Sequence, residues 1–302
     1  MTATCLFGLE GLVSQELKFM GAENVCAENG RVFFEGDENI LARANINSRF
    51  AERIMIVGDR FKATTFTELF DKVKLINWCD FIGKNDAFPV KGYSIDSALH
   101  SVPDCQKIIK KAVVESLKED YRIDWFRETG AVHQIRFSII KDDVTVMLDT
   151  SGAGLHKRGY RPESNDAPIR ETLAAAIIML SVWNKDRPLI DCFAGSGTIP
   201  IEAALIAQNT APGIKRHFAF EQFKGAPQVI DKVRDEALSV QNLDVKTRIS
   251  GFDIDGDSIK MAMIHAENAG VKNLIHFQQM DMRDVSTKQK YGVLISNLPF
   301  GE

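Results

Sequence analysis

The chain has 302 residues, of which 45% are hydrophobic and 26% charged, and its formal net charge at pH 7 is −4. These values exclude disordered, collagen-like and low-complexity proteins, and they argue against a protein that coats nucleic acid by bulk positive charge. Because a single hydrophobic core stops growing at roughly 250 to 300 residues, we expect at least two domains.

The sequence lacks the features of membrane-spanning, secreted and metal-binding proteins. Its longest apolar run, residues 173–183, is shorter than the roughly 18 to 20 residues that cross a bilayer. The first twenty residues have no basic region and include Glu10 and Glu16, so we predict no signal peptide and expect a cytoplasmic protein. The five cysteines form no CxxC pair, which predicts neither a disulfide framework nor a zinc site.

Short strands and helices alternate over the first 150 residues. Apolar residues at helical spacing follow Leu9 until Gly21, and Asp37 and Thr64 or Thr65 are suitable N-caps for two further helices. The predicted strands are residues 3–7, 31–35, 53–61, 133–140 and 144–148, and the predicted helices are residues 9–20, 37–46, 65–74 and 103–117. This order predicts an α+β module of antiparallel hairpins with covering helices.

The pattern changes after residue 150. Residues 151–166 are rich in Gly, Ser and basic residues and have no apolar period, so we place a domain linker there. Beyond it, the predicted helices are residues 169–183, 198–208, 228–242 and 257–269, and the predicted strands are residues 188–193, 247–253, 275–279 and 291–296. This alternation predicts βαβ units, a parallel sheet and ligands at the carboxyl ends of its strands.

A glycine-containing turn, DCFAGSGT, follows the first strand of the second half. Gly195 and Gly197 in this turn would let the backbone approach a ligand, and the N-terminus of the next helix would favour an anionic group. An ordinary tight loop between a strand and a helix has the same composition. A dinucleotide fingerprint would need a third glycine where this chain has Pro200, which argues against NAD.

Acidic residues follow the next two strands. Asp253 lies where a carboxylate can accept hydrogen bonds from both hydroxyls of a ribose, although Asp253 or Asp255 could instead cap the next helix. Asp281 and Met282 are placed to meet the amino group and the face of an adenine ring, but a solvated loop acid is an equally good interpretation.

The fourth strand ends in Asn297, Leu298, Pro299 and Phe300. The side-chain oxygen of Asn297 and the carbonyl of Leu298 can each accept a hydrogen bond from an exocyclic amine. Pro299 restricts the backbone, and Phe300 offers a ring for stacking. An isolated NLPF string is more often a turn, but its position after a glycine loop and an acid-tipped strand favours a base-binding site.

In this order, DCFAGSGT, GFDID, DM and NLPF resemble motifs I to IV of class I S-adenosylmethionine (SAM) methyltransferases of the Asn-Pro-Pro-Tyr amino-methylating group. The stretches APIRETLA, and APGI followed by FAFE, are similar to the THUMP-containing RNA guanine-N2 methyltransferases that act on large-subunit ribosomal RNA. In the N-terminal half, the resemblance is carried by GLEGLVSQEL, RVFFEGD, SVPDCQKIIKKAVVESL and VMLDTSGAGLHKRGYR, so it covers essentially the whole chain.

The resemblance implies an α/β, Rossmann-like class I methyltransferase domain with a parallel sheet, preceded by an α+β ferredoxin-like and THUMP module. The implied boundaries are 1–60 for the ferredoxin-like segment, 61–150 for the THUMP RNA-binding domain, 151–166 for the linker and 167–302 for the methyltransferase domain. A class I sheet would need further strands, on the order of 70 residues, beyond Glu302. We therefore expect the sequence to represent part of a longer protein.

The resemblance also assigns residues to the cofactor, SAM, and to the target base. The implied SAM-binding residues are Asp191, Ala194, Gly195 and Gly197 at the methionine end, Asp253 at the ribose, Asp281 and Met282 at the adenine, and Arg170 and Thr172 as our candidates at the methionine carboxylate. Residues 297–300 would hold the base. Leu298 replaces the first proline of the usual motif, so the loop keeps the carbonyl but loses one rigid φ angle.

We hypothesise in-line transfer of the SAM methyl group to the N2 amine of a guanine in RNA, driven by positioning and by hydrogen bonds. The same four motifs would serve methylation of adenine or of a protein glutamine, and a transfer-RNA guanine methyltransferase has a related architecture. An RNA-binding protein whose methyltransferase fold no longer turns over is a further alternative.

Two basic clusters are candidate RNA contacts. One is the lysine face of the helix at 103–117, Lys107, Lys110 and Lys111, although such faces are usually just solvated. The other lies in the linker, where His156, Lys157, Arg158 and Arg161 surround Tyr160. We favour the linker cluster, because an aromatic residue is interleaved with its cations.

Overall fold

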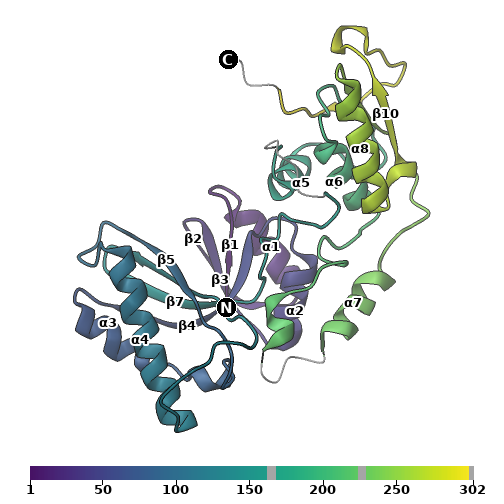
Figure 1. Ribbon diagram of the computed structural model, residues 1–302. Coiled ribbons are helices and arrows are strands. Elements are labelled where there is room, and N and C mark those ends of the chain that lie inside the picture. The colour runs from purple at the N-terminus through teal and green to yellow at the C-terminus, as the bar shows by residue number, and fades with distance from the viewer. Residues whose placement is uncertain (162–167, 224–228, 299–302) are drawn as a thin grey trace.

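The computed structural model of the protein describes residues 1–161, 168–223 and 229–298. Within these residues the strands form two sheets, one of seven strands and one of four (Figure 1). The larger sheet holds the strands of the first half of the chain, and the smaller sheet holds those of the second half. The predicted change from an α+β module to a parallel α/β domain is therefore confirmed.

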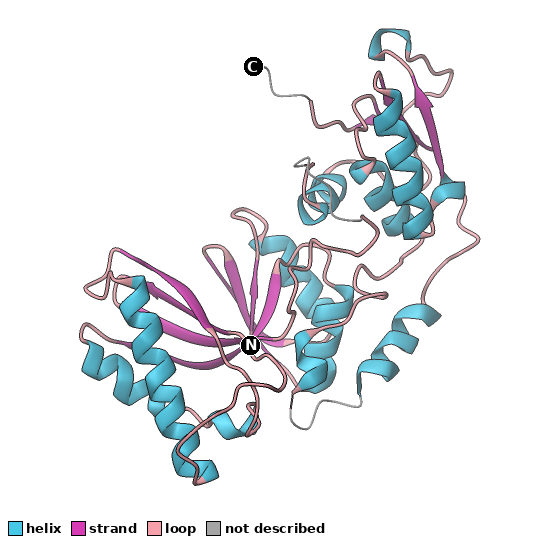
Figure 2. Cartoon of the chain, viewed as in Figure 1, coloured by secondary structure: helices cyan, strands magenta, loops and turns pink. Residues whose placement is uncertain are grey.

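The seven-stranded sheet has the order β2-β3-β1-β4-β7-β6-β5, and its strands are antiparallel except for the parallel pair β5 and β6. The strands are Thr2–Thr4 (β1), Glu23–Glu28 (β2), Arg31–Glu35 (β3), Arg53–Lys62 (β4), Val90–Ile95 (β5), Ile135–Ile140 (β6) and Asp143–Asp149 (β7). The helices are Glu10–Phe19 (α1), Glu38–Asn47 (α2), Phe66–Lys74 (α3) and Val102–Tyr121 (α4), with a short 3-10 helix at Trp78–Asp80. The four α-helices cover one face of the sheet (Figure 2).

Local capping explains where two of these helices begin. The Asp37 side chain accepts a hydrogen bond from the Ile40 amide at the start of α2. Thr65 and Glu68 form a reciprocal capping box at the start of α3. Both predicted N-caps are confirmed, with Thr65 rather than Thr64 as the cap of α3.

Sequence patterning missed β2 and β5, which are the two edge strands of this sheet. In β2, residues such as Glu23, Asn24 and Cys26 are exposed, so the strand shows no apolar alternation. An edge strand is bonded to only one neighbour and needs to bury little, so β2 has no period-two pattern, and β5 alternates only between half-buried and exposed residues with none fully buried.

The four-stranded sheet is fully parallel and has the order β10-β9-β8-β11. Its strands are Leu189–Asp191 (β8), Ile249–Asp253 (β9), Ile275–Gln279 (β10) and Val293–Leu294 (β11). The accompanying helices are Glu171–Leu180 (α5), Thr198–Ala207 (α6) and Gly256–Ala269 (α8), with 3-10 helices at Lys272–Leu274 and Met282–Asp284. Because β9 and β11 lie on opposite sides of β8, the strand order reverses there and opens a crevice at the carboxyl end of β8.

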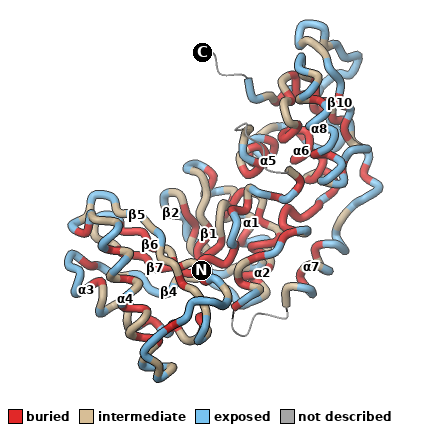
Figure 3. The backbone as a smooth tube through the Cα atoms, in the orientation of Figure 1, coloured by how far each residue is buried: buried red, intermediate tan, exposed pale blue. Residues whose placement is uncertain are grey.

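Part of the second half of the chain packs on the first module. Helix α7 (Val229–Ser239) lies against α2 (Figure 1), and Arg43 on α2 forms an ion pair with Glu236 on α7 at 3.0 Å. Near the 3-10 helix Ala219–Gln222, Phe218 and Phe220 are buried in the same hydrophobic core as the first module. Residues 210–223 thus tie the second half of the chain to the first core, whereas α7 is buried only on the side that carries Val233 and Ala237 (Figure 3).

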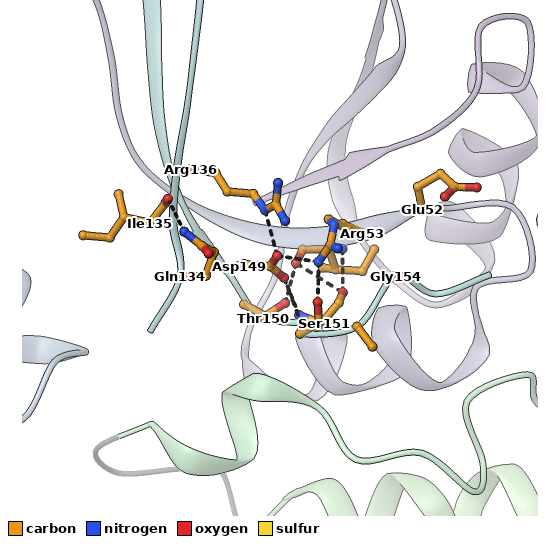
Figure 4. A network of polar contacts seen from close by, with 12 residues as sticks. Glu52, Arg53, Gln134, Ile135, Arg136, Asp149, Thr150, Ser151 and Gly154 are labelled. Atoms are coloured by element: carbon orange, nitrogen blue, oxygen red, sulfur yellow. Dashed lines mark hydrogen bonds and ion pairs between the residues drawn. The ribbon is translucent and has the colours of Figure 1, made fainter. Parts of the chain in front are cut away.

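The predicted linker is a packed segment over its described residues. The Asp149 carboxylate accepts hydrogen bonds from the Ser151 and Gly152 amides and from the guanidinium groups of Arg53 and Arg136 (Figure 4). Arg216, from the second half, donates to the carbonyls of Ala153 at 2.7 Å and Gly154 at 2.9 Å. These charge-assisted bonds hold the backbone of the segment in one conformation.

Within the described part of the chain, no helix combines the length and apolarity that crossing a membrane requires. In the same residues, His, Cys, Asp and Glu side chains form no group of three or more that could hold a metal ion.

Candidate cofactor and base-binding site

A cavity of about 430 Å³ lies at the carboxyl ends of β8 and β9 and beside the residues that follow β11. Its lining includes Asp191, Asp253 and Asn297 from three different strand ends. Residues of the glycine turn complete one wall, and Pro168 and Ile169, which precede α5, complete another. The structure therefore brings together motif residues that are more than one hundred positions apart, at the crevice that the strand order creates.

The glycine turn has the geometry that sequence analysis expected. Gly195 has a φ of +50° and Gly197 a φ of +83°, both in the left-handed region that favours glycine. A Cβ atom at Gly197 would lie 2.9 Å from the Cβ of Ala262 on α8, whereas one at Gly195 would meet nothing within 4 Å. Gly197 thus allows close packing of α6 against α8, and Gly195 leaves open space on the cavity side.

Asp191 is buried at the end of β8, with 1% of its surface exposed. Burial raises the pKa of its carboxyl group to about 6, while hydrogen bonds from the Ser296 hydroxyl and the Phe193 amide oppose this rise. Ser296 also accepts a hydrogen bond from the Cys192 amide at 2.9 Å, so it ties the end of β11 to the end of β8. Ser296 is not among the predicted site residues, because its only signal in the sequence is its position immediately before Asn297.

Asp253 holds the glycine turn in place. One of its carboxylate oxygens accepts a hydrogen bond from the Gly195 amide at 2.8 Å, and the other accepts one from the Asp255 amide. Asp255 is the N-cap of α8 and accepts hydrogen bonds from the Asp257 and Ser258 amides. Of the two acids that could cap this helix, Asp255 does so, and Asp253 is left to line the cavity.

The two residues expected at the adenine do not line the cavity. Asp281 accepts two hydrogen bonds from the Arg283 guanidinium, and these bonds lower the pKa of its carboxyl group to about 2. Met282 is 51% exposed. Both residues follow β10, beside the Met280 amide that donates to the carbonyl of Asp253, so they lie near the ribose candidate but outside the enclosed space.

Asn297 and Leu298 line the cavity, and both are exposed to solvent. Pro299 and Phe300, the other two residues of the predicted base-binding motif, lie outside the described residues. Asn297 and Leu298, the two described residues of the motif, therefore line the same cavity as Asp191 and Asp253.

Arg170 and Thr172 point away from the position expected for them. The Thr172 hydroxyl donates to Glu52 at 2.6 Å, and the Arg170 guanidinium lies 3.5 Å from the same carboxylate. Neither residue lines the cavity, which is instead bordered by Pro168 and Ile169 from the same stretch. The expected contact with a methionine carboxylate is therefore corrected to a contact with the first module, because a partly buried acid there takes both donors.

The basic clusters are separated by the structure. Lys107 is exposed on α4, whereas Lys110 is engaged by Glu128 at 2.7 Å and lies over the Phe88 ring, and Lys111 lies over the Phe70 ring. In the linker, Lys157 is exposed, and the His156 ring is bonded to Glu52.

The expectation of RNA contacts at Arg158 and Arg161 requires correction. Arg158 is buried, donates to the carbonyls of Leu155 and Arg49, and lies 3.7 Å from Glu202. Arg161 pairs with Glu171 and donates to the Thr198 hydroxyl at the start of α6. Both guanidinium groups are paired with acids, carbonyls or a hydroxyl inside the protein. Of Lys157, Arg158 and Arg161, only Lys157 is therefore exposed to solvent.

Three family profiles match successive parts of the chain. They are the RlmL ferredoxin-like domain over residues 1–55, the THUMP domain over residues 63–149 and the RMKL-like methyltransferase domain over residues 158–302. A Bacillus subtilis (strain 168) protein named "Putative RNA methyltransferase YpsC" is 47% identical over 306 residues, which covers 100% of this chain and 79% of that protein. The "Ribosomal RNA large subunit methyltransferase K/L" of Buchnera aphidicola is 33% identical, and the match covers 99% of this chain but 44% of that protein.

Two solved structures share the fold at high identity. The first, from Listeria monocytogenes and described as a "predicted N6-adenine-specific DNA methylase", is 49% identical with a TM-score of 0.96, and the match covers 100% of this chain and 80% of that one. The second, described as "SMU.472, a putative methyltransferase complexed with SAH", is 42% identical with a TM-score of 0.94 and the same coverage.

The parallel sheet, the glycine turn and the strand-end acids define a class I methyltransferase, a fold that uses SAM as its cofactor. The chain belongs to the methyltransferase family in which an RlmL ferredoxin-like domain and a THUMP domain precede an RMKL-like methyltransferase domain.

The charge of the cavity suits SAM. Among the described residues, no cationic side chain forms an ion pair with Asp191 or Asp253, although both line the cavity. A buried carboxylate without a counter-ion is costly unless a cation joins it. The ammonium and sulfonium groups of SAM are cations of that kind.

Proposed function

We propose that this protein transfers a methyl group from SAM to the exocyclic N2 amine of a guanine in RNA, with large-subunit ribosomal RNA as the substrate and the cytoplasm as its location. The observation that carries the proposal is the placement of Asn297 and Leu298 on the wall of the cavity that also contains Asp191 and Asp253. An amine acceptor there would lie beside the cofactor, in a chain whose first half contains a THUMP domain.

The roles of the residues follow from their chemistry. When bound, SAM supplies an electrophilic methyl group. Asp191 would face the ammonium of its methionine end, and Asp253 would accept hydrogen bonds from its ribose hydroxyls. The Asn297 side-chain oxygen and the Leu298 carbonyl would accept the two hydrogens of the guanine amine and orient its nitrogen toward the methyl group. The new bond between nitrogen and carbon would form as the bond between the methyl carbon and the sulfonium sulfur breaks, which leaves a neutral thioether, and one amine proton would pass to water. The hydrogen bonds strengthen as positive charge develops on the nitrogen, so no strong base is required.

Residues assigned by resemblance complete the proposal. Phe300 would stack on the guanine after it leaves the RNA stack, Pro299 would restrict the loop, and Asp281 and Met282 would contact the adenine of SAM. Lys107, Lys111 and Lys157 remain candidate surface contacts for RNA, since all three are exposed and Lys107 is paired with an acid, Asp104, that is itself on the surface.

Two other nucleic-acid substrates would suit the same motifs. Transfer-RNA guanine is one, and adenine, for which the Listeria monocytogenes relative is named, is the other. The THUMP domain favours RNA over DNA, and the relative named as a ribosomal RNA large subunit methyltransferase favours ribosomal RNA over transfer RNA. Guanine rather than adenine rests on the sequence resemblance alone. An inactive fold that only binds RNA would take up SAM without transferring its methyl group.

The direct test is transfer of tritiated methyl from SAM to unmodified ribosomal RNA, to transfer RNA and to DNA, followed by nucleoside analysis. We expect label in N2-methylguanosine from ribosomal RNA. Label in N6-methyladenosine, or in transfer RNA alone, would replace the proposed substrate. SAM binding in calorimetry without transfer to any of the three would refute the enzymatic proposal.

Asn297→Ala is expected to abolish transfer while leaving the affinity for SAM nearly unchanged, because it removes an acceptor for the amine and no cofactor contact. Asn242→Ala, at an exposed position outside the cavity, is the matched control. Turnover of the Asn297 variant at the wild-type rate would contradict the assignment of the base-binding wall.

A further inference from the structure

A second cavity, of about 440 Å³, lies on the face of the seven-stranded sheet that the helices leave uncovered (Figure 2). Val32 and Phe34 on β3 are buried in the core beneath the helices, so the alternate residue Arg31 projects from the opposite face. Ser138 on β6 and Thr145 on β7 are paired across the sheet and line the same cavity. The cavity therefore spans both the ferredoxin-like and the THUMP segments.

The floor of this cavity contains a buried cation with no acidic partner. Arg31 is 7% exposed, and its guanidinium donates to the Ser138 hydroxyl at 3.1 Å and to the Tyr93 hydroxyl at 2.8 Å. Among the described residues, no carboxylate forms an ion pair with it. Removing a charged group from water without a counter-ion is costly, so an anion entering the cavity would be bound strongly by this guanidinium.

Two further cations border the cavity. Arg60 pairs with Glu28 at 2.6 Å and lies over the Phe33 ring, and Lys141 is exposed at the turn between β6 and β7. The acids that line the cavity are Glu28, which Arg60 already engages, and Asp143. The cavity thus has an excess of positive charge in a protein whose net charge is −4.

The surroundings of the cavity suit a nucleic acid chain rather than a free anion. Tyr93, whose hydroxyl is bonded to Arg31, is 44% exposed on this face. Proteins bind single-stranded RNA by combining cationic side chains, which bind the phosphates, with aromatic rings, on which the bases stack. The cavity and Tyr93 together offer both kinds of group.

We propose that the Arg31 cavity binds a backbone phosphate of single-stranded RNA, with Arg31 and Lys141 as its charged ligands and Tyr93 as a stacking platform for an adjacent base. This inference rests on the proposed function, because it identifies where the RNA substrate is held outside the methyl-transfer site.

The test is binding of a fluorescein-labelled single-stranded RNA oligonucleotide to the whole protein over a series of salt concentrations. Arg31→Gln and Lys141→Gln are each expected to weaken binding and to reduce the magnitude of the slope of log affinity against log salt by at most about 0.7, the value for complete loss of one phosphate contact on a single strand. Lys18→Gln, at an exposed lysine on α1 and thus on the helix side of the sheet, is expected to change neither quantity.

Arg31 is buried, so its substitution could unfold the protein. In that case Lys141→Gln alone tests the proposal, because Lys141 is exposed at a turn and its substitution is not expected to disturb the fold. An unchanged affinity and salt slope in Lys141→Gln, or the same loss in Lys18→Gln, would overturn the proposal. Tritium transfer by the wild-type protein is measured in parallel. Wild-type RNA binding without methyl transfer would count against the proposed function alone, whereas transfer by the wild type with unchanged binding in both cavity variants would count against the cavity alone.

Discussion

At the level of single residues, the cofactor cavity depends on how Asp191 is held. Its carboxyl group is removed from water, and within the described chain the Ser296 hydroxyl and the Phe193 amide stabilise its charged form. The folded-state pKa of about 6 lies above the ordinary value of 3.8, so between these two pH values folding favours the protonated form, whereas at pH 7 the group is mostly ionised. Without ligand, this group makes the folded state less stable as the pH rises from 3.8 toward 6, and has no further effect above that range.

The same shift predicts a pH dependence of cofactor binding. We expect SAM affinity to rise as the pH increases through about 6, because ionised Asp191 attracts the ammonium of SAM. Asp191→Asn should bind more weakly at pH 7 and show no such rise. Ser296→Ala should move the midpoint upward, because the lost hydrogen bond had lowered the pKa. Calorimetric titrations across this pH range check these outcomes, and pH-independent binding by the wild type would show that Asp191 does not face the ammonium.

At the level of elements, the turn between β8 and α6 determines how closely α6 and α8 approach. Both glycines of the turn have positive φ angles, but only Gly197 lies against another helix. The backbone conformation and the helix contact therefore impose separate requirements, which substitution can distinguish.

Gly197→Ala is expected to lower the free energy of unfolding by about 2 kcal/mol or more, since it combines left-handed strain with a methyl group forced against Ala262. Gly195→Ala is expected to cost about 1 kcal/mol, from the backbone conformation alone. Urea unfolding of both variants gives the comparison. Equal losses would mean that the contact with Ala262 relaxes freely.

At the level of the whole molecule, the segment between the two sheets positions one module against the other. Arg216 is buried and reaches back to the carbonyls of Ala153 and Gly154, and burial lowers the pKa of its guanidinium to about 10, which leaves it charged at neutral pH. If RNA bound on the first module is to reach Asn297 on the second, the distance between them has to be defined. A clamped segment defines it, whereas a free tether would not.

Arg216→Ala is expected to reduce the free energy of unfolding by about 2 to 4 kcal/mol, because it leaves two carbonyls without their donors. Lys215→Ala, at the exposed neighbouring position, is expected to change stability by no more than about 0.5 kcal/mol. Thermal unfolding monitored by circular dichroism measures both. If the two variants were equally stable, the clamp would contribute nothing to holding the modules together.

Much of this architecture was predictable because its signals are local. The capping residues Asp37 and Thr65, the glycines of the turn and the alternation of strands with helices each act over a few neighbouring positions. The order of the strand-end residues Asp191, Asp253 and Asn297 along the chain was sufficient to predict that they meet, because parallel strands place their carboxyl ends at one edge.

The sequence by itself therefore determined the fold class and the order of the motifs, and it indicated part of the cavity lining, namely Asp191, Ala194, Gly195, Asp253, Asn297 and Leu298. Only the tertiary structure decided which polar groups are paired. The Ser296 hydroxyl donates to Asp191, which is 105 positions away in the sequence, and the Arg31 guanidinium donates to Ser138, which is 107 positions away. Arg158 is buried, although its neighbours in the sequence predict a basic surface. A charged side chain looks the same in the sequence whether it meets water, an internal carbonyl or a ligand, because its environment is supplied by residues that are distant along the chain.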